Sequence, residues 1–151
     1  MPRAQCLVVK GLKILMAKHC ENDQEYWCLP GGGIEMGELP AESALRELRE
    51  ECNVTGKIVR ETSVVTYSQT DRHYTFLIDI GDQTPCMGYD PELRQGNQIL
   101  KEIKWMSLNE LSECDRVYLW AGGLLGLPGF LEEVESWKDD ISYPKGVNNV
   151  T

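Results

Sequence analysis

The sequence is poor in positive charge. Its 151 residues include 15 Lys and Arg against 24 Asp and Glu, so the formal net charge is −9 and the isoelectric point is about 4.7. Such a chain has no general attraction for a nucleic-acid backbone, and we expect no nucleic acid among its partners. A polyanionic small substrate would need bound cations between itself and the protein.

The sequence also lacks an apolar segment of membrane-spanning length. Its most apolar run, residues 117–131, is too short and is broken by glycine and proline. The first residues do not show the charged, apolar and small-residue pattern of a secretory signal. We therefore expect no membrane among the partners and a cytoplasmic location. The Asn-X-Thr sequons at Asn53 and Asn149 are then chance matches.

Paired cysteine motifs are absent as well. The chain has six cysteines, but none shows the C-x-x-C spacing of redox or zinc-ribbon motifs. The sequence therefore predicts reduced and mostly buried thiols. A second interpretation places His19, Cys20 and Cys28 near one another as metal ligands.

The length of the chain suggests one domain. Hydrophobic residues make up 42% and charged residues 26% of the chain, as in ordinary globular proteins. No internal repeat or interdomain linker interrupts it. We expect residues 1–143 to form a single domain and the polar tail 144–151 to fray.

Periodic patterns predict strands interspersed with helices, and hence a layered α/β or α+β domain. Residues 20–25 read as a polar loop, and residues 81–98 as a long loop of a kind that is often functional or disordered. We expect strands at 5–9, 13–17, 27–29, 57–67, 73–80 and 99–106. Helical segments are expected at 40–52, 108–111, 117–125 and from Pro128 onward.

The expected helix 40–52 carries an unusual group of acidic residues. Pro40 suits its first turn, and Asn53 can adopt the left-handed conformation that ends a helix. At about 100° per residue, Glu47, Glu50 and Glu51 fall within an arc of roughly 100°. The apolar residues of the helix occupy the neighbouring arc, so the carboxylates can point into a groove beside the core.

Crowded carboxylates suggest a bound cation. Like-charge neighbours cost only about 0.2–0.5 kcal/mol per pair in water, but much more in a desolvated groove. Mg²⁺ and Mn²⁺ prefer such hard oxygen ligands and bind phosphate-bearing partners. On its own, "RELREE" is typical of a solvated helix face.

The spacing between this helix and the preceding glycines resembles the box of the Nudix (MutT-like) hydrolase family, G-x5-E-x7-R-E-U-x-E-E-x-G-U. Asn53 stands at the one position that differs, where the family has glycine; asparagine tolerates the same positive φ. The "WCLPGG" segment before the box also resembles the family's usual lead-in. The matching positions are Gly32, Glu38, Arg46, Glu47, Leu48, Glu50, Glu51 and Val54.

The resemblance implies an α/β/α sandwich with a mixed β-sheet and an enzyme that acts on phosphorus anhydrides. The implied reaction is Mg²⁺-dependent (or Mn²⁺-dependent) cleavage of a diphosphate linkage in a nucleoside diphosphate derivative. That derivative is a nucleotide sugar, an ADP-ribose-like compound or a nucleoside triphosphate. The alternative is a non-catalytic Nudix-like nucleotide sensor or partner-binding domain. A homodimer is left open.

The resemblance also implies roles for individual residues. Glu47, Glu50 and Glu51 would bind the metal together with the Gly31 carbonyl, and Arg46 and Glu38 would form an ion pair between loop and helix. Glu50 or Glu51, acting through metal-bound water, is one source of a general base. Some family members supply a base before a strand Trp, but Ile99 occupies that position here. Glu102 and Glu92 are the other acidic candidates nearby.

Substrate contacts are expected from Trp27, Tyr67, Arg72 and Glu102. Aromatic rings could stack on a base, and Arg72 could contact a phosphate. Alternatively, Tyr67 packs in the fold and Arg72 lies in a solvated turn. The proline that often marks ADP-ribose hydrolases is replaced by Ser68, so the substrate stays open.

Overall fold

The computed structural model describes residues 1–88 and 99–137 of the chain. One sheet has the order β5-β1-β7-β6. Its strands are β1 (Arg3–Leu7), β5 (Gly31–Gly33), β6 (Lys57–Ser68) and β7 (Asp71–Asp79). β1 runs parallel to β7 and antiparallel to β5, while β6 and β7 form an antiparallel hairpin. The sheet is therefore mixed, as expected.

A second, antiparallel sheet is built around β3 (Lys13–Glu21). This strand pairs with β2 (Val9–Lys10), β4 (Gln24–Cys28) and β8 (Leu100–Met106). The chain passes directly from β1 into β2, so the two sheets are joined at that point. β8 belongs to this sheet because it pairs with β3.

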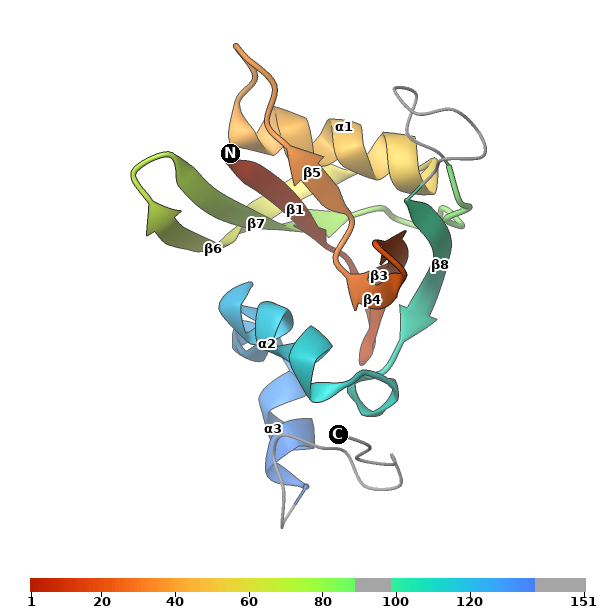
Figure 1. Ribbon diagram of the computed structural model, residues 1–151. Coiled ribbons are helices and arrows are strands. Elements are labelled where there is room, and N and C mark those ends of the chain that lie inside the picture. Colours follow the sequence, from red (N-terminus) through yellow and green to blue (C-terminus); the bar gives the residue numbers. More distant parts are fainter. Residues whose placement is uncertain (89–98, 138–151) are drawn as a thin grey trace.

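Helices cover the sheets on two sides (Figure 1). α1 (Pro40–Cys52) packs on β1 and β5, while α2 (Glu113–Ala121) and α3 (Phe130–Glu135) lie on the opposite side. Short 3-10 turns at Leu108–Glu110 and Leu124–Gly126 flank α2. This is the α/β/α sandwich that the resemblance implies. No helix in 1–88 or 99–137 is long and apolar enough to cross a membrane.

Alternation along β1 divides the core between the two helical layers. Ala4 and Cys6 are buried in the cluster under α1, whereas Leu7 is buried in the cluster that includes α2 and α3. The apolar run 117–131 supplies much of that second cluster. Its buried members are Leu119, Leu124, Leu127 and Phe130.

The expected helix 40–52 is confirmed at both ends, and the expected strands are present with ends shifted by a few residues. The polar loop at 20–25 is wrong: β3 and β4 meet in a tight hairpin at Asn22 and Asp23. Both residues have positive φ, of 54° and 62°. Two such residues form the turn type that matches strand twist, and Asn and Asp tolerate it. The tail 144–151 and Glu92 lie outside the described residues.

All six cysteines are free thiols. Only Cys6 and Cys52 are buried, and Cys86 and Cys114 are exposed, so the expectation of mostly buried thiols is only partly met. The interpretation of His19, Cys20 and Cys28 as one metal site is wrong. Cys20 is adjacent to His19 in β3 and so faces the other side of the sheet, and no such cluster occurs within the described ranges.

Candidate active site

Helix α1 is positioned by its apolar stripe and by its two ends. Ala44, Leu48 and Cys52 are fully buried against the sheet. The Leu39 amide donates a hydrogen bond to the Glu42 side chain (2.8 Å) at the start of the helix, and Asn53 ends the helix in the left-handed conformation, with φ of 54°. Because the stripe is fixed, the neighbouring acidic face is also fixed in direction.

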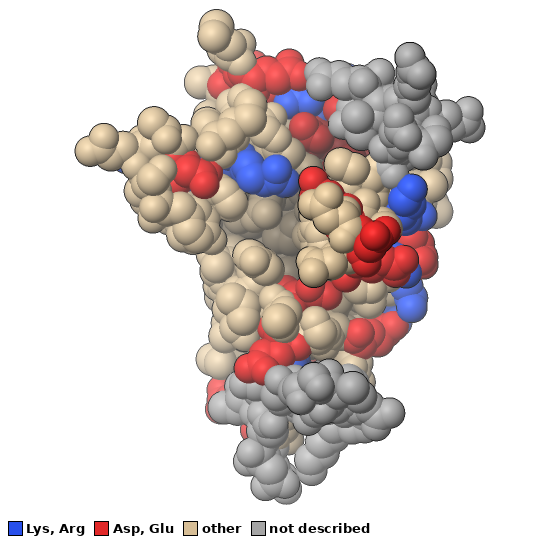
Figure 2. Space-filling model, viewed as in Figure 1, with Lys and Arg blue, Asp and Glu red and all other residues tan. Residues whose placement is uncertain are grey.

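That acidic face forms one wall of a cavity of about 480 Å³ between α1 and the strands. Glu47, Glu50 and Glu51 lie on this wall, Glu35 lines the cavity from the loop before α1, and the glycines of β5 form the floor. On the face shown in Figure 2, acidic side chains outnumber basic ones, and a small basic patch lies above a central hollow. The cavity is thus predominantly acidic.

Arg46 ties the loop after β5 to α1. Its guanidinium donates to both carboxylate oxygens of Glu38, at 2.7 and 3.0 Å, and to the Gly33 carbonyl at 3.1 Å. This bidentate pair lowers the pKa of Glu38 to about 2. The remaining Arg46 nitrogen lies 3.1 Å from Glu47 and 3.3 Å from Glu50. The Arg46 guanidinium therefore bridges the loop and two carboxylates of the helix.

The carboxylates of Glu51 and Glu47 lie close to the backbone of β5. Glu51 is buried, and its Oε1 accepts the Gly31 amide hydrogen at 2.7 Å. Its Oε2 lies 3.5 Å from His19 Nε2. Burial and the nearby Glu51 and Glu50 charges raise the pKa of Glu47 to about 7. A methyl group at Gly32 would lie 2.5 Å from Glu47 Oε1, so only glycine allows this approach.

The donor set fits a hard divalent cation. Glu47, Glu50 and Glu51 offer carboxylate oxygens on one wall, and the raised pKa of Glu47 reflects crowding that a cation would relieve. Within 1–88 and 99–137, however, no three His, Cys, Asp or Glu side chains already surround one centre. Arg46 and the Gly31 amide hold these carboxylates instead. Gly31 contributes its N–H here, whereas the family resemblance implies a role for its carbonyl.

Four residues expected to contact substrate do not line this cavity. Trp27 and Glu102 lie on the other face of the sheet: Trp27 follows Tyr26 in β4, and Glu102 is paired with Lys18, the neighbour of His19. Tyr67 and Arg72 lie at the far end of the β6–β7 hairpin, where the Tyr67 ring packs on His73 at 4.6 Å. Tyr67 is 53% exposed.

The sequence does not bring together the residues of the wall opposite the carboxylates. This wall consists of Arg3 from β1, His19 and Glu21 from β3, and Tyr26 from β4. The His19 and Tyr26 rings are 5.6 Å apart. Recognition of the turn at Asn22 predicts a β3–β4 hairpin, and alternation across that hairpin groups His19 with Tyr26. Ile99 also lines the cavity and provides no proton acceptor there.

Comparisons with known proteins agree with this geometry. Residues 1–125 match the NUDIX domain. The chain is 32% identical over 97 residues to 8-oxo-dGTP diphosphatase of Escherichia coli K12, covering 64% of this chain and 67% of that protein. It is 34% identical over 79 residues to a diphosphoinositol polyphosphate phosphohydrolase of Homo sapiens. That match covers 50% of this chain and only 42% of the human protein.

Solved structures show the same fold at lower identity. The MutT NUDIX hydrolase from Burkholderia pseudomallei superposes with a TM-score of 0.60 at 20% identity, covering 80% of this chain and 98% of that one. A NUDIX hydrolase from Nitrosomonas europaea gives a TM-score of 0.61 at 21% identity, covering 76% of this chain and 61% of that one. At these identities the likeness concerns the fold.

Proposed function

Because the chain belongs to the NUDIX domain family, we propose that it is a Mg²⁺-dependent hydrolase of a diphosphate linkage in a nucleoside diphosphate derivative. One observation carries the proposal: the acidic face of α1 is held against the glycines of β5 by the Glu51–Gly31 hydrogen bond and the Arg46–Glu38 ion pair. A solvated acidic helix face would need neither contact.

Glu47, Glu50 and Glu51 would hold the cation, with the backbone of Gly31 beside them. When bound, the cation neutralises phosphate oxygens and polarises the attacking water. Arg46 acts by position: it keeps Glu38 and the loop close to α1, and it restrains Glu47 and Glu50. The missing side chain at Gly32 leaves room for the Glu47 carboxylate beside the backbone of β5.

The proton from the attacking water needs an acceptor in the cavity. Ile99 has none, and Glu102 belongs to the other face of the sheet. Glu51 already accepts the Gly31 amide hydrogen, whereas Glu50 is the most exposed of the three helix glutamates, at 31%. We therefore assign the proton acceptor to a Glu50 carboxylate oxygen, with Glu51 as the buried ligand.

The opposite wall favours a nucleotide as substrate. The cavity volume of about 480 Å³ falls in the usual range for small-molecule sites, and the His19 and Tyr26 rings offer apolar surface for a base. Arg3 is the only Lys or Arg besides Arg46 that lines the cavity within the described ranges. So little positive charge suits a nucleoside diphosphate derivative better than a heavily phosphorylated inositol.

A hydrolysis panel tests the proposal. ADP-ribose, nucleotide sugars, nucleoside triphosphates and dinucleoside polyphosphates are each incubated with Mg²⁺ and with Mn²⁺. At least one compound should be hydrolysed, and Glu51→Gln should abolish that turnover while circular dichroism shows an intact fold. Nucleotide binding without turnover of any compound would instead identify a sensor. Full turnover by Glu51→Gln would refute the assigned site.

A further inference from the structure

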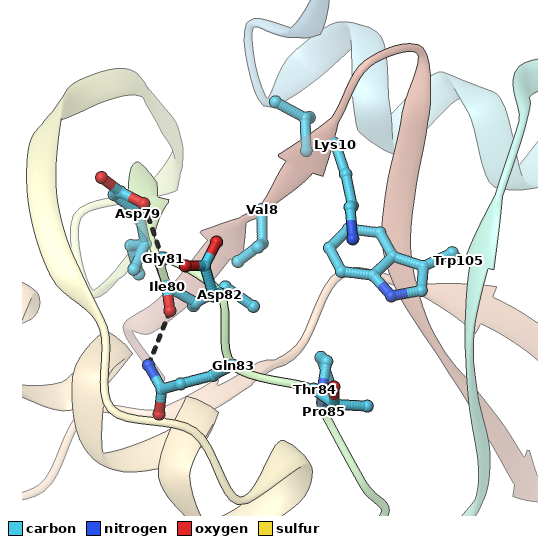
Figure 3. A pocket seen from close by; sticks show the side chains of 12 residues that line it. Val8, Lys10, Asp79, Ile80, Gly81, Asp82, Gln83, Thr84, Pro85 and Trp105 are labelled. Atoms are coloured by element: carbon cyan, nitrogen blue, oxygen red, sulfur yellow. Dashed lines mark hydrogen bonds between the residues drawn. The ribbon is translucent and has the colours of Figure 1, made fainter.

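A second cavity, of about 190 Å³, lies at the other end of β1 (Figure 3). It forms where the parallel strands β1 and β7 end and their chains diverge, the one into β2 and the other into the loop from Ile80 to Pro85. Carboxyl ends of parallel strands are common ligand positions. Arg3 begins β1 in the candidate active site, so at about 3.3 Å per residue the two cavities are roughly 15 Å apart. They share no lining residue.

Buried residues and a hydrogen-bonded loop build the cavity. Its floor contains Val8, Ile78 and Ile80, which are all buried, and Trp105 forms one side. Gln83 fixes the loop wall: its Nε2 donates to the Ile80 and Thr55 carbonyls, both at 2.7 Å. Its Oε1 accepts the Thr55 amide hydrogen at 2.9 Å. A wall held in this way loses little freedom when a ligand binds.

Charges of opposite sign face this small cavity. The Lys10 side chain extends from β2 beside Trp105, and the Asp82 side chain extends from the loop on the other side of Val8 (Figure 3). Asp79 also lines the cavity and accepts the Gly81 amide hydrogen at 2.8 Å. Within 1–88 and 99–137, no ion pair closer than 4.0 Å joins Lys10, Asp79 or Asp82 to any group. The three side chains are exposed at the rim of the cavity, and their charges are not paired with one another.

We propose that this cavity binds a small zwitterion of the α-amino acid class. The ligand's ammonium group would lie at Asp82 and Asp79, its carboxylate at Lys10, and its side chain against Val8 and Trp105. Two carboxylates and one ammonium disfavour phosphate-bearing ligands. The volume is also below the roughly 300–1,000 Å³ of sites for larger ligands. A nucleotide therefore does not fit this second site.

The loop wall connects this site to α1. Beyond Pro85, the Cys86 amide donates to the Cys52 carbonyl at 3.0 Å, and the Gly88 amide donates to the Glu51 carbonyl at 2.7 Å. The same segment therefore borders the cavity and is bonded to the backbone of the proposed metal-binding helix. Occupancy of the cavity would stabilise this segment, although ligand binding itself does not depend on the proposed hydrolysis.

The test uses the full chain and requires no enzymatic activity. The twenty protein amino acids are screened at millimolar concentration by thermal shift, and the best is titrated by calorimetry. Its analogues without the amino group and without the carboxylate group should bind at least tenfold more weakly. Asp82→Asn and Lys10→Gln should each weaken binding at least tenfold, whereas Lys57→Gln on β6 and Glu51→Gln in the candidate active site should not.

Two results would overturn the proposal. One is the absence of any thermal shift across the screen. The other is equal binding by the analogues, or by Asp82→Asn and Lys10→Gln variants that circular dichroism shows to be folded. Because Glu51→Gln removes the proposed hydrolysis but leaves this cavity intact, failure of one proposal can be distinguished from failure of the other.

Discussion

At the residue scale, Gly32 determines whether Glu47 can lie where it does. We expect Gly32→Ala to displace the Glu47 carboxylate, because the new methyl group would be 2.5 Å from its Oε1. Mg²⁺ affinity should fall at least tenfold by calorimetry, with the fold retained. Gly126→Ala, where no atom lies within 4 Å, is the matched control. Unchanged Mg²⁺ affinity in Gly32→Ala would argue against Glu47 as a ligand.

Glu47 also gives the metal-free protein a distinctive pH dependence. Its pKa is raised from 4.5 to about 7, so the folded state holds this proton more tightly than the unfolded state does. The resulting stabilisation is fully present below pH 4.5 and is lost as the pH rises through 7; it amounts to at most about 3 kcal/mol. Without divalent ions, thermal melts should show wild type losing stability from pH 5 to pH 8, and Glu47→Gln losing less. Parallel curves for the two proteins would contradict this.

The sequence predicts the acidic wall of the candidate active site better than the wall opposite it, and the reason is physical. Glu47, Glu50 and Glu51 are grouped by the period of one helix, which can be read locally. Arg3 and Tyr26 meet only because β1 and β4 belong to sheets that converge at the cavity. Such proximity depends on strand pairing between distant segments and leaves no short-range pattern.

At the element scale, Arg46 joins the loop of residues 33–38 to α1. We expect Arg46→Ala to destabilise the protein by about 1–3 kcal/mol, because Glu38 and the Gly33 carbonyl lose their donor. Urea unfolding would measure the loss. Arg49→Ala on the exposed side of the same helix is the control and should change stability by less than about 0.5 kcal/mol. Equal effects of the two substitutions would show that the bridge is not specific.

The elements differ in how well local patterns specify them. Helix α1 has Pro40 at its start, Asn53 at its end and a regular apolar stripe, and its predicted bounds are confirmed. The sequence predicts a loop at residues 20–25, where the polar ends of β3 and β4 meet, because these residues lack a strand pattern. There, positive φ at Asn22 and Asp23 outweighs the low strand propensity of the flanking residues.

At the scale of the whole molecule, a divalent cation should stabilise the fold by mass action. At a concentration 100 times its Kd, a ligand bound only by the folded state adds about 2.7 kcal/mol. The melting temperature should therefore rise when Mg²⁺ or Mn²⁺ is added and return to its starting value when a chelator is added. The increase should be much smaller in Glu51→Gln. An equal increase in that variant would point to cations bound elsewhere on this acidic chain.

The mixed sandwich was expected from the box resemblance, and the structure and its neighbours confirm it. The division into two sheets joined at β1 and β2 was not expected. It depends on which of several similar strands pair, and hydrophobic alternation alone does not distinguish partners.

The position of β1 has a consequence for how the protein folds. β1 is flanked by β5 and β7, and its register with β7 joins Arg3 to His73, residues separated by 70 positions. Such non-local parallel pairing is slow because a long loop must close before contacts compensate for its entropy. The contact between α1 and β5 is far more local. During synthesis α1 can therefore pack on β5 early. β1 can pair with β7 only after residues 71–79 have been synthesised.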